Sequence, residues 1–562
     1  MKPYLLSRRD LLIASVVSLA GCSPSSRKSQ SAVTSSPVQA TPSLISFKNV
    51  TESAGISYKW QINAPRPLNI LGTIGNGCAF LDYDMDGNLD ILLVGNRLAI
   101  YKGDGKGNFR DVSDETGLSK LNGHFLGCAV GDYDNDGYPD IYLTAYSGGA
   151  LLHNEGGKHF IDVSSHAGIP AQPWGTSAAW VQLSPGSGLL DLVIGNYVSF
   201  GPNTSPQLCP NGDYMTSCGP RYYKAHHPKL YKNVGGGKFQ DVSAQWKMST
   251  SHGKNLGIAC ADYDHSGRQS ISFANDEVEG DLMSNTGSSF NNVAAFAGTA
   301  FDHDGTRHGG MGTDWGDYDN DGRLDLVVAT FQNETKCIYH NEGGGNFSEV
   351  AERLGLAAIA LPYVSFGAKW LDVDNDGWLD LIIASGHVQD NIHEIDPASH
   401  YKEPTLLLHN KQGELFEDIS SSSGTAFGVP IVGRGLAIGD YDNDGRMDAL
   451  VVDSEGAPLL LHNESSTNNN WLILNLEGVE SNRQGYGALV TLDTGTQKLL
   501  RVCHADGSYM SSSDPRVHCG LGTSDNATVT VKWPSGKSTS YGRLTANRQY
   551  KLKEGDTTPH VL

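Results

Sequence analysis

The sequence lacks the motifs that mark the common enzyme classes. It contains no HExxH metal motif, no nucleophile elbow and no glycine-rich phosphate loop. Basic patches with interleaved aromatic residues are also absent, so nucleic acid is not an expected partner. Beyond the first 22 residues, no apolar run is long enough to cross a bilayer. These absences favour a binding function over catalysis.

Aspartate and glycine are abundant instead. The 562 residues include 67 glycines and carry a formal net charge of -21. Much of the negative charge lies in nine-residue segments of the pattern D-x-D-x-D-G-x-x-D. Five bound divalent cations would reduce the net charge to about -11. The acidity therefore indicates a requirement for cations before it says anything about partners.

Five of these segments are intact, and each has the ligand pattern of a calcium loop. Carboxylates at positions 1, 3, 5 and 9 and the main-chain carbonyl of position 7 are hard oxygen ligands, and the glycine at position 6 permits a sharp turn. An EF-hand would need a glutamate at position 12, but the last segment has Val451 there, inside a β-branched run. Each loop is therefore expected to join two strands.

We predict about five Ca²⁺ ions as cofactors. Their predicted ligands are Asp82, Asp84, Asp86, Asn88 and Asp90; Asp132, Asp134, Asp136, Tyr138 and Asp140; Asp317, Asp319, Asp321, Arg323 and Asp325; Asp372, Asp374, Asp376, Trp378 and Asp380; and Asp440, Asp442, Asp444, Arg446 and Asp448. The alternative is a set of Asx-turns without metal. Two weaker copies, Leu183–Asp191 and Asp262–Ser270, are expected to be poor sites, although Asp262 and Asp264 remain as candidate ligands.

A second signature follows each loop and indicates a β-hairpin. Examples are LLHNEGGKHFIDV from Leu151 and IYHNEGGGNFSEV from Ile338, in which Asn and Gly supply the positive φ angles of a tight turn. Seven units of about four strands each result, which fits propeller blades. The seventh unit lacks its Phe-x-x-Val strand, whereas Phe47–Ile56 has that strand without a hairpin partner. We expect the amino-terminal strand to complete the last blade.

These motifs resemble those of a known family. The acidic loops with their hairpins look like the FG-GAP/VCBS repeats of integrin α-type propellers. The segment from Trp471, Gly507-Ser508-Tyr509, VHCGLG from Val517 and VKWPSG from Val531 are similar to the ASPIC/UnbV module of the cartilage acidic protein family. Cys519 stands where that pattern has Phe. The resemblance implies an all-β fold, a seven-bladed β-propeller with a small β-sandwich-like ASPIC/UnbV module at the carboxyl end.

The domain organisation follows from these patterns. Residues 1–22 are predicted to be a signal peptide, with a twin-arginine-like motif and a lipobox that would place lipid on Cys22; an ordinary secretory signal is the alternative. We expect residues 23–44 to form a flexible Ser/Pro-rich tether. Residues 45–467 are predicted to form the propeller, whose last blade is completed by the strand in residues 45–56, and residues 468–556 are predicted to form the terminal module. We expect an exported protein anchored by lipid to a bacterial membrane, at the outer membrane or cell surface.

The remaining candidates lie in insertions and in the terminal module. Cys209 and Cys218 are close in sequence and predict a disulfide, with a zinc site involving His226 and His227 as the alternative. A Cys503–Cys519 disulfide is left open. The best candidates for contact with a partner, because Tyr and Arg anchor interfaces, are Tyr214, Arg221, Tyr222 and Tyr223.

The sequence favours a calcium-binding, membrane-tethered protein of adhesion or assembly, with a protein or glycan as its partner and membrane contact through the lipid only. A rival hypothesis is a propeller enzyme, a hydrolase, lyase or oxidoreductase, with a site on the axis built from His252, Asp276, His308 and His387. A third is a scaffold for a biosynthetic or export complex. The rival predicts that those four side chains converge in one pocket.

Overall fold

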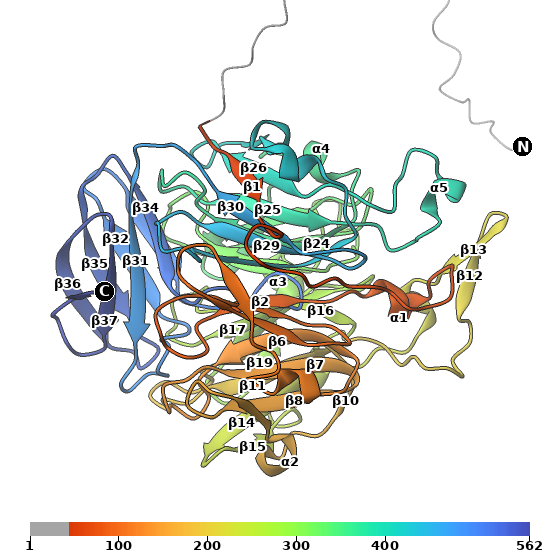
Figure 1. The fold of residues 1–562 in the computed structure, drawn as a ribbon, viewed down its shortest axis with the longest axis horizontal. Helices are drawn as coiled ribbons and strands as arrows, with labels where there is room; N and C mark the ends of the chain where they lie inside the picture. Colours follow the sequence, from red (N-terminus) through yellow and green to blue (C-terminus); the bar gives the residue numbers. More distant parts are fainter. Residues whose placement is uncertain (1–43) are drawn as a thin grey trace, which may run out of the picture. The chain divides into compact units, whose positions relative to one another are not determined.

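The computed structural model describes residues 44–562, whose regular structure is mainly β-sheet with strands that pair mostly antiparallel (Figure 1). The all-β prediction is confirmed. The α-helices of the described chain are short: α1 (Ile70–Thr73), α2 (Ser164–Ala167), α3 (Ala294–Ala297), α4 (Leu356–Ala360) and α5 (Ile392–Ile395). In residues 44–562 no helix has the length and apolar character to span a membrane. The predicted signal peptide, Cys22 and nearly all of the predicted tether lie outside the described residues.

Repeated four-strand antiparallel units make up the first part of the described chain. In chain order the units are β2 (Cys78–Leu81), β3 (Asp90–Leu93), β4 (Ala99–Gly103) and β5 (Phe109–Asp111); β6 (Phe125–Gly131), β7 (Asp140–Gly148), β8 (Ala150–Asn154) and β9 (Phe160–Asp162); β10 (Gln172–Val181), β11 (Asp191–Asn196), β14 (Lys229–Gly235) and β15 (Lys238–Asp241); and β16 (Asn255–Ala261), β17 (Ser270–Asn275), β18 (Asp281–Asn285) and β19 (Phe290–Asn292). The second and third units are joined by pairing of β7 with β10.

Three further units follow the same order. They are β20 (Thr313–Gly316), β21 (Asp325–Val328), β22 (Cys337–Gly343) and β23 (Asn346–Glu349); β24 (Ser365–Leu371), β25 (Asp380–Ser385), β26 (Leu406–Asn410) and β27 (Phe416–Asp418); and β28 (Gly433–Gly439), β29 (Asp448–Asp453) and β30 (Leu459–Asn463) with β1 (Phe47–Asn49). In the last unit β1 pairs antiparallel with β30, Phe47 opposite Asn463. Strands from the two ends of this region therefore share one sheet.

Aromatic stacking links several of the loops to the next unit, although the loop at Asp372 has Val373 in place of the tyrosine. The tyrosine at loop position 2 is buried and lies parallel to a tryptophan that precedes the next loop: Tyr263 stacks on Trp315 at 5.6 Å, and Tyr318 on Trp370 at 6.0 Å between ring centroids. Such pairs contribute about 0.5–1.5 kcal/mol beyond the area that they bury. The loops are thus positioned by the hydrophobic core between units as well as by their own turns.

The asparagine of the hairpin signature makes a second link between units. The Nδ2 of Asn410 donates to the carbonyl of Leu379 in its own loop and to that of Tyr318 in the preceding loop, both at 2.8 Å. The same pair of contacts recurs in five other units, at Asn154, Asn233, Asn285, Asn341 and Asn463. The asparagine of the His-Asn, Lys-Asn or Ser-Asn dipeptide therefore encodes a contact between neighbouring units.

Removing one of these amides should destabilise the fold. We expect Asn410→Ala to lower the free energy of unfolding by about 2–4 kcal/mol, because it leaves buried main-chain groups without partners. The measurement is equilibrium denaturation. The exposed neighbour Lys411 provides the control, since Lys411→Ala should change stability by less than about 0.5 kcal/mol. If the two substitutions changed stability equally, the Asn410 amide would not be a stabilising link between neighbouring units.

The terminal module consists of two four-stranded sheets. One contains β34 (Val517–Gly522), β31 (Asn470–Glu477), β37 (Arg548–Lys553) and β38 (His560–Val561), and the other β33 (Lys498–Val502), β32 (Leu489–Asp493), β35 (Asn526–Lys532) and β36 (Ser538–Thr545). Buried residues of both sheets, including Leu474 and Val529, belong to one hydrophobic cluster that continues into the β10 unit. The module therefore shares a core with the repeats.

One segment of the module, residues 505–514, pairs with the first strands of several repeat units. Ser508 exchanges two main-chain hydrogen bonds with Thr313 at 2.7 and 3.2 Å, and the carbonyl of Met510 accepts from Cys128 at 3.0 Å. Gly507 donates to Ile258 in a further unit. We call residues 505–514 the central segment, because strands far apart in the sequence all contact it.

Candidate metal centres in the acidic loops

Each acidic loop joins the first and second strands of its unit and is closed by its own carboxylates. In the last loop, Asp440 accepts main-chain hydrogen bonds from Asp444 at 3.0 Å and from Gly445 at 2.9 Å, and Asp444 accepts from Arg446 at 2.9 Å. Asn443 and Gly445 have positive φ angles of 60° and 87°. Glycine tolerates this conformation without steric cost, which explains its place at position 6.

The other intact loops have the same geometry. Position 1, at Asp82, Asp132, Asp317 and Asp372, accepts from the main chain of positions 5 and 6. The position 7 residues Asn88, Tyr138, Arg323 and Trp378 donate their N–H to the position 5 carboxylate. The local sequence therefore holds the carboxylates of positions 1 and 5 in the same way in each intact loop.

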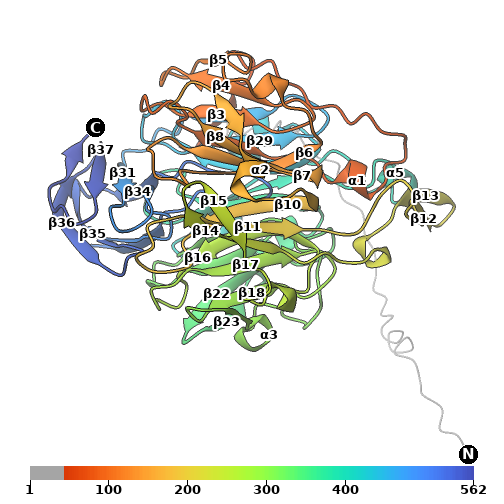
Figure 2. The same ribbon diagram turned by 90° about the horizontal axis from the view of Figure 1, so that it is seen from below.

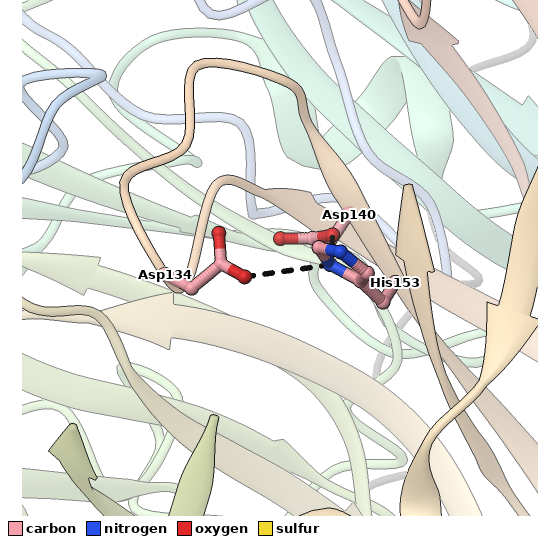
Figure 3. Close-up of side chains that lie close together, drawn as sticks. All are labelled: Asp134, Asp140 and His153. Atoms are coloured by element: carbon pink, nitrogen blue, oxygen red, sulfur yellow. Dashed lines mark hydrogen bonds and ion pairs between the residues drawn. The ribbon is translucent and has the colours of Figure 1, made fainter. Parts of the chain in front are cut away.

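A histidine of the hairpin lies against the carboxylates of four of the five loops, and the sequence analysis did not single it out. Figure 3 shows His153 between Asp134 and Asp140, with Nδ1 at 3.4 and 3.1 Å from their carboxylate oxygens. His340, His409 and His462 stand in the same way in the last three intact loops. The sequence did contain a sign of these histidines, because each of the four stands in the repeated His-Asn dipeptide of the hairpin. In the first loop Lys102 takes this place and forms ion pairs with Asp84 and Asp86.

The residues present fit a hard cation. The Oδ1 atoms of Asp84, Asp374 and Asp442, all at position 3, are buried and have no hydrogen-bond partner among the described residues. An unsatisfied buried carboxylate oxygen is unfavourable unless a proton or a cation reaches it. Oxygen ligands of this kind suit Ca²⁺ rather than a soft transition metal. Position 3 carboxylates would therefore be ligands of a bound ion.

Burial raises the pKa of many loop carboxylates. Burial first, and neighbouring carboxylates in addition, raise the pKa of Asp90 and of Asp440 to about 8 and that of Asp448 to about 7. For His153 the hydrogen bond to Asp140 raises the pKa to about 9. Without a cation, the folded loops therefore hold protons near neutral pH that the unfolded chain would release.

These shifts predict that acid stabilises the calcium-free protein. Carboxylates with a raised pKa contribute stability that is present below their unfolded pKa and is lost as the pH rises through 6 to 8, and His153 acts in the same direction up to about 9. We expect the melting temperature in chelator to fall steadily between about pH 5 and pH 9. Scanning calorimetry with and without calcium tests this, and a rise of the chelated melting temperature with pH would contradict it.

The weaker copies are built differently. The Nζ of Lys532, from the terminal module, lies 3.0 Å from Asp262 Oδ2 and donates to the carbonyl of His265 at 3.1 Å. A lysine ammonium thus stands against the first carboxylate of that loop. In the other weak copy Leu183 donates its N–H to Asp191 Oδ2, the contact that position 2 makes elsewhere. Asp262 and Asp264 are therefore poorer metal candidates than the intact sets.

The cysteines within residues 44–562 divide into one disulfide and buried thiols. Cys209, in strand β12 (Leu208–Asn211), is bonded to Cys218, directly after strand β13 (Tyr214–Ser217), so neither can act as a zinc ligand. The possible Cys503–Cys519 disulfide is not formed. Cys503 instead donates to the carbonyls of Gln484 and Pro515, and burial raises the pKa of Cys519 to about 12, so each thiol is an inert core group.

The proposed contact residues separate into exposed and buried groups. Tyr214 and Tyr222 are 43% and 51% exposed. The guanidinium of Arg221 lies 5.7 Å from the centre of the Tyr222 ring. Tyr223 is buried, and its hydroxyl donates to Pro206, so it packs the insertion and offers no surface. Three of the four predicted contact residues therefore remain available.

The four side chains of the rival enzyme hypothesis have separate partners. His252 Nδ1 lies 2.6 Å from Asp281, the Nε2 of buried His308 lies 3.0 Å from the Tyr339 hydroxyl, and His387 Nδ1 accepts from the main chain of Gln389. Asp276 alone of the four lines the large cavity beside α1. The structure therefore does not join them into one catalytic group.

Comparisons with known proteins agree with the sequence motifs. A family model for the FG-GAP-like repeat matches residues 82–143, 317–383 and 372–451, and a model described as ASPIC and UnbV matches residues 478–559. The chain is thus an FG-GAP repeat protein with an ASPIC/UnbV domain, and the resemblance found in the sequence is confirmed.

Its curated relatives are cartilage acidic proteins. The chain is 25% identical over 392 residues to cartilage acidic protein 1 of Homo sapiens, covering 67% of this chain and 53% of that protein, and 24% identical to the Mus musculus protein, with 67% and 54% covered. The chain spans about half the length of the curated relatives it matches. Among solved structures, an Agrocybe aegerita protein described as recognising non-reducing terminal N-acetylglucosamine has a TM-score of 0.38 and 17% identity, with 68% of this chain and 87% of that chain covered.

Proposed function

We propose that this protein is a calcium-stabilised, seven-bladed β-propeller that acts as a binding protein outside the cytoplasm. The seven four-strand units would be the blades, and the two sheets of the terminal module a β-sandwich. Antiparallel pairing of β1 with β30 supports a closed ring, because it joins the first and last described strands of the repeat region in one blade. Closure leaves no long free sheet edge.

The observation that carries the calcium proposal is the set of unpartnered position 3 oxygens in Asp84, Asp374 and Asp442. They lie beside carboxylates whose pKa burial has raised, such as Asp376 and Asp440. A divalent cation would satisfy the oxygens and relieve the repulsion between carboxylates. Histidine and lysine from the hairpins moderate this repulsion in part. Calcium would therefore act as a structural ligand of the loops.

The extracytoplasmic binding role rests on the family and on the leader sequence. Residues 1–22 carry the pattern of an exported lipoprotein, with lipid on Cys22 as the anchor. The FG-GAP and ASPIC/UnbV matches favour adhesion or assembly over catalysis. A protein or glycan partner would meet exposed anchors such as Tyr214 and Tyr222. The insertion disulfide is consistent with an oxidising compartment.

Counting bound calcium in matched variants tests the proposal. Wild-type protein lacking the leader should bind about five ions per chain by equilibrium dialysis. Asp442→Asn, at position 3 of an intact loop, should remove about one ion. Asp264→Asn, at position 3 of the loop that Lys532 neutralises, should remove none. Equal counts in the two variants, or no bound calcium in the wild type, would rule out the loops as metal sites.

A further inference from the structure

A cavity of about 350 Å³ lies beside α1 and the β12–β13 hairpin, away from the terminal module. Figures 1 and 2 both place α1, α5 and this hairpin together on the side opposite the module's sheets. The central segment nevertheless reaches the cavity, where Tyr509 forms part of its wall and donates its hydroxyl to Ile74. The volume of the cavity lies in the range of pockets that hold small organic ligands.

Three carboxylates line the cavity, and each has one oxygen in use and one free. Asp276 Oδ2 accepts from the Tyr197 hydroxyl, Glu277 Oε2 accepts from the N–H of Arg221 at 3.2 Å, and Glu334 Oε2 accepts from the N–H of Gly309 at 2.7 Å. No described donor reaches the second oxygen of any of the three. The cavity therefore presents three carboxylate oxygens that no described hydrogen-bond donor satisfies.

The negative charge on each of the three carboxylates is unfavourable for the charge on the other two. Burial, and then the charges of Glu277 and Glu334, raise the pKa of Asp276 to about 7, and burial raises the pKa of Glu334. Lys254 and Lys336 lie nearby but do not line the cavity, and Lys336 donates to main-chain carbonyls. A cation inside the cavity would relieve the repulsion that remains.

One further feature points to a ligand, beside the left-handed backbone of Glu277, whose φ of 56° is unfavourable for glutamate. Thr216, on the cavity wall, is 2% exposed, and its hydroxyl has no hydrogen-bond partner among the described residues. A bound molecule would supply the missing partner.

Apolar and aromatic residues form part of the remaining wall, beside polar ones such as Asn211 and Gln389. Phe331, Phe366 and Met311 line it together with Ile70 of α1. The one cationic side chain of the wall, Arg221, has its guanidinium over the Tyr222 ring. The combination of an acidic end and an aromatic wall matches a molecule with a charged amine on a hydrophobic body.

We propose that this cavity binds an organic ammonium ion, with the ammonium held by Asp276, Glu277 and Glu334 and the apolar body against Phe331 and Phe366. A primary ammonium has three N–H donors, which equals the number of free carboxylate oxygens. Hydrogen bonds between charged partners are about twice as strong as neutral ones, so the charge dominates selectivity. This site goes beyond the proposed function, because it needs neither the calcium loops nor the exposed tyrosines.

Isothermal titration with phenethylamine tests the proposal, in saturating calcium so that the loops remain filled. We expect one saturable site per chain and affinity at least about tenfold higher than for 2-phenylethanol, which has the same shape without the charge. Glu334→Gln and Glu277→Gln should each weaken phenethylamine about tenfold and leave 2-phenylethanol unchanged. Glu342→Gln, on the exposed edge of β22, is the matched control and should change neither.

A second variant separates binding from folding. Glu277→Gly removes the carboxylate and also the backbone strain at this position, so it should not lower the melting temperature although it weakens phenethylamine. Absence of saturable phenethylamine binding, equal affinity for the amine and the alcohol, or loss of melting temperature in step with affinity would each overturn the proposal. If the calcium proposal failed, the number of calcium ions bound per chain would show it, and the affinity for phenethylamine would be unaffected.

Discussion

Removing calcium is expected to unfold this protein at temperatures where the calcium-bound form is stable. For loops with dissociation constants of about 0.1–1 mM, about 10 mM calcium stabilises each site by about 1.4–2.7 kcal/mol. Five such sites would together contribute about 7–13 kcal/mol, which is comparable to the whole stability of a typical domain. The measurement is the melting temperature by scanning calorimetry during a calcium titration from chelator.

The controls separate specific binding from charge screening. Potassium chloride at matched ionic strength screens the loop carboxylates but cannot bridge them, so it should raise the melting temperature far less than calcium. Magnesium should also be a poor substitute, because it demands near-ideal octahedral geometry and loses its water reluctantly. If chelator, potassium and calcium all gave the same melting temperature, the loops would be Asx-turns without metal.

Breaking the ion pair under the central segment is expected to have the second large effect. Lys369 and Asp314 are 2% and 1% exposed, and their Nζ and Oδ1 atoms lie 2.8 Å apart. Lys369 also donates to the carbonyl of Asp506, at 3.0 Å, in the central segment. Asp314→Ala leaves a buried ammonium without its counter-charge, so it should lower the free energy of unfolding by about 3–5 kcal/mol.

A double substitution distinguishes an unpaired charge from lost packing. Adding Lys369→Met to Asp314→Ala removes the uncompensated ammonium, so the double variant should be more stable than Asp314→Ala alone. Equilibrium denaturation in saturating calcium gives both values. If Lys369→Met lowered the free energy of unfolding as much in the Asp314→Ala background as in the wild type, the two residues would act independently. The ion pair would then contribute nothing to stability.

The acidic loops could be predicted because their geometry is local. Nine residues contain the first carboxylate, the glycine with positive φ and the residues whose main-chain N–H groups close the turn, as Asp440, Gly445 and Arg446 show. The odd spacing of the carboxylates is therefore visible in the sequence. The family resemblance rests on the same local repeats, which is why the family models match it.

Features that depend on distant residues were not predicted. Nothing in the sequence near Asp262 shows that Lys532 will neutralise it from 270 residues away. Asp276 was named as a member of an axial catalytic group, but its neighbours in the cavity are Glu277 and Glu334 rather than the histidines. The hairpin histidines were visible in the repeat, yet only the packed hairpin shows that His462 faces Asp448.

The sequence by itself determined the all-β class, the acidic loops and the kinship with FG-GAP and ASPIC/UnbV proteins, because each of these depends on residues within one turn or one repeat. Only the tertiary structure decided that the central segment would pair with strands of several units, that Lys532 would reach Asp262, and that the adjacent acids Asp276 and Glu277 would meet Glu334 of another unit around one cavity. Those contacts depend on how the units pack against one another, and no short stretch of sequence contains that information.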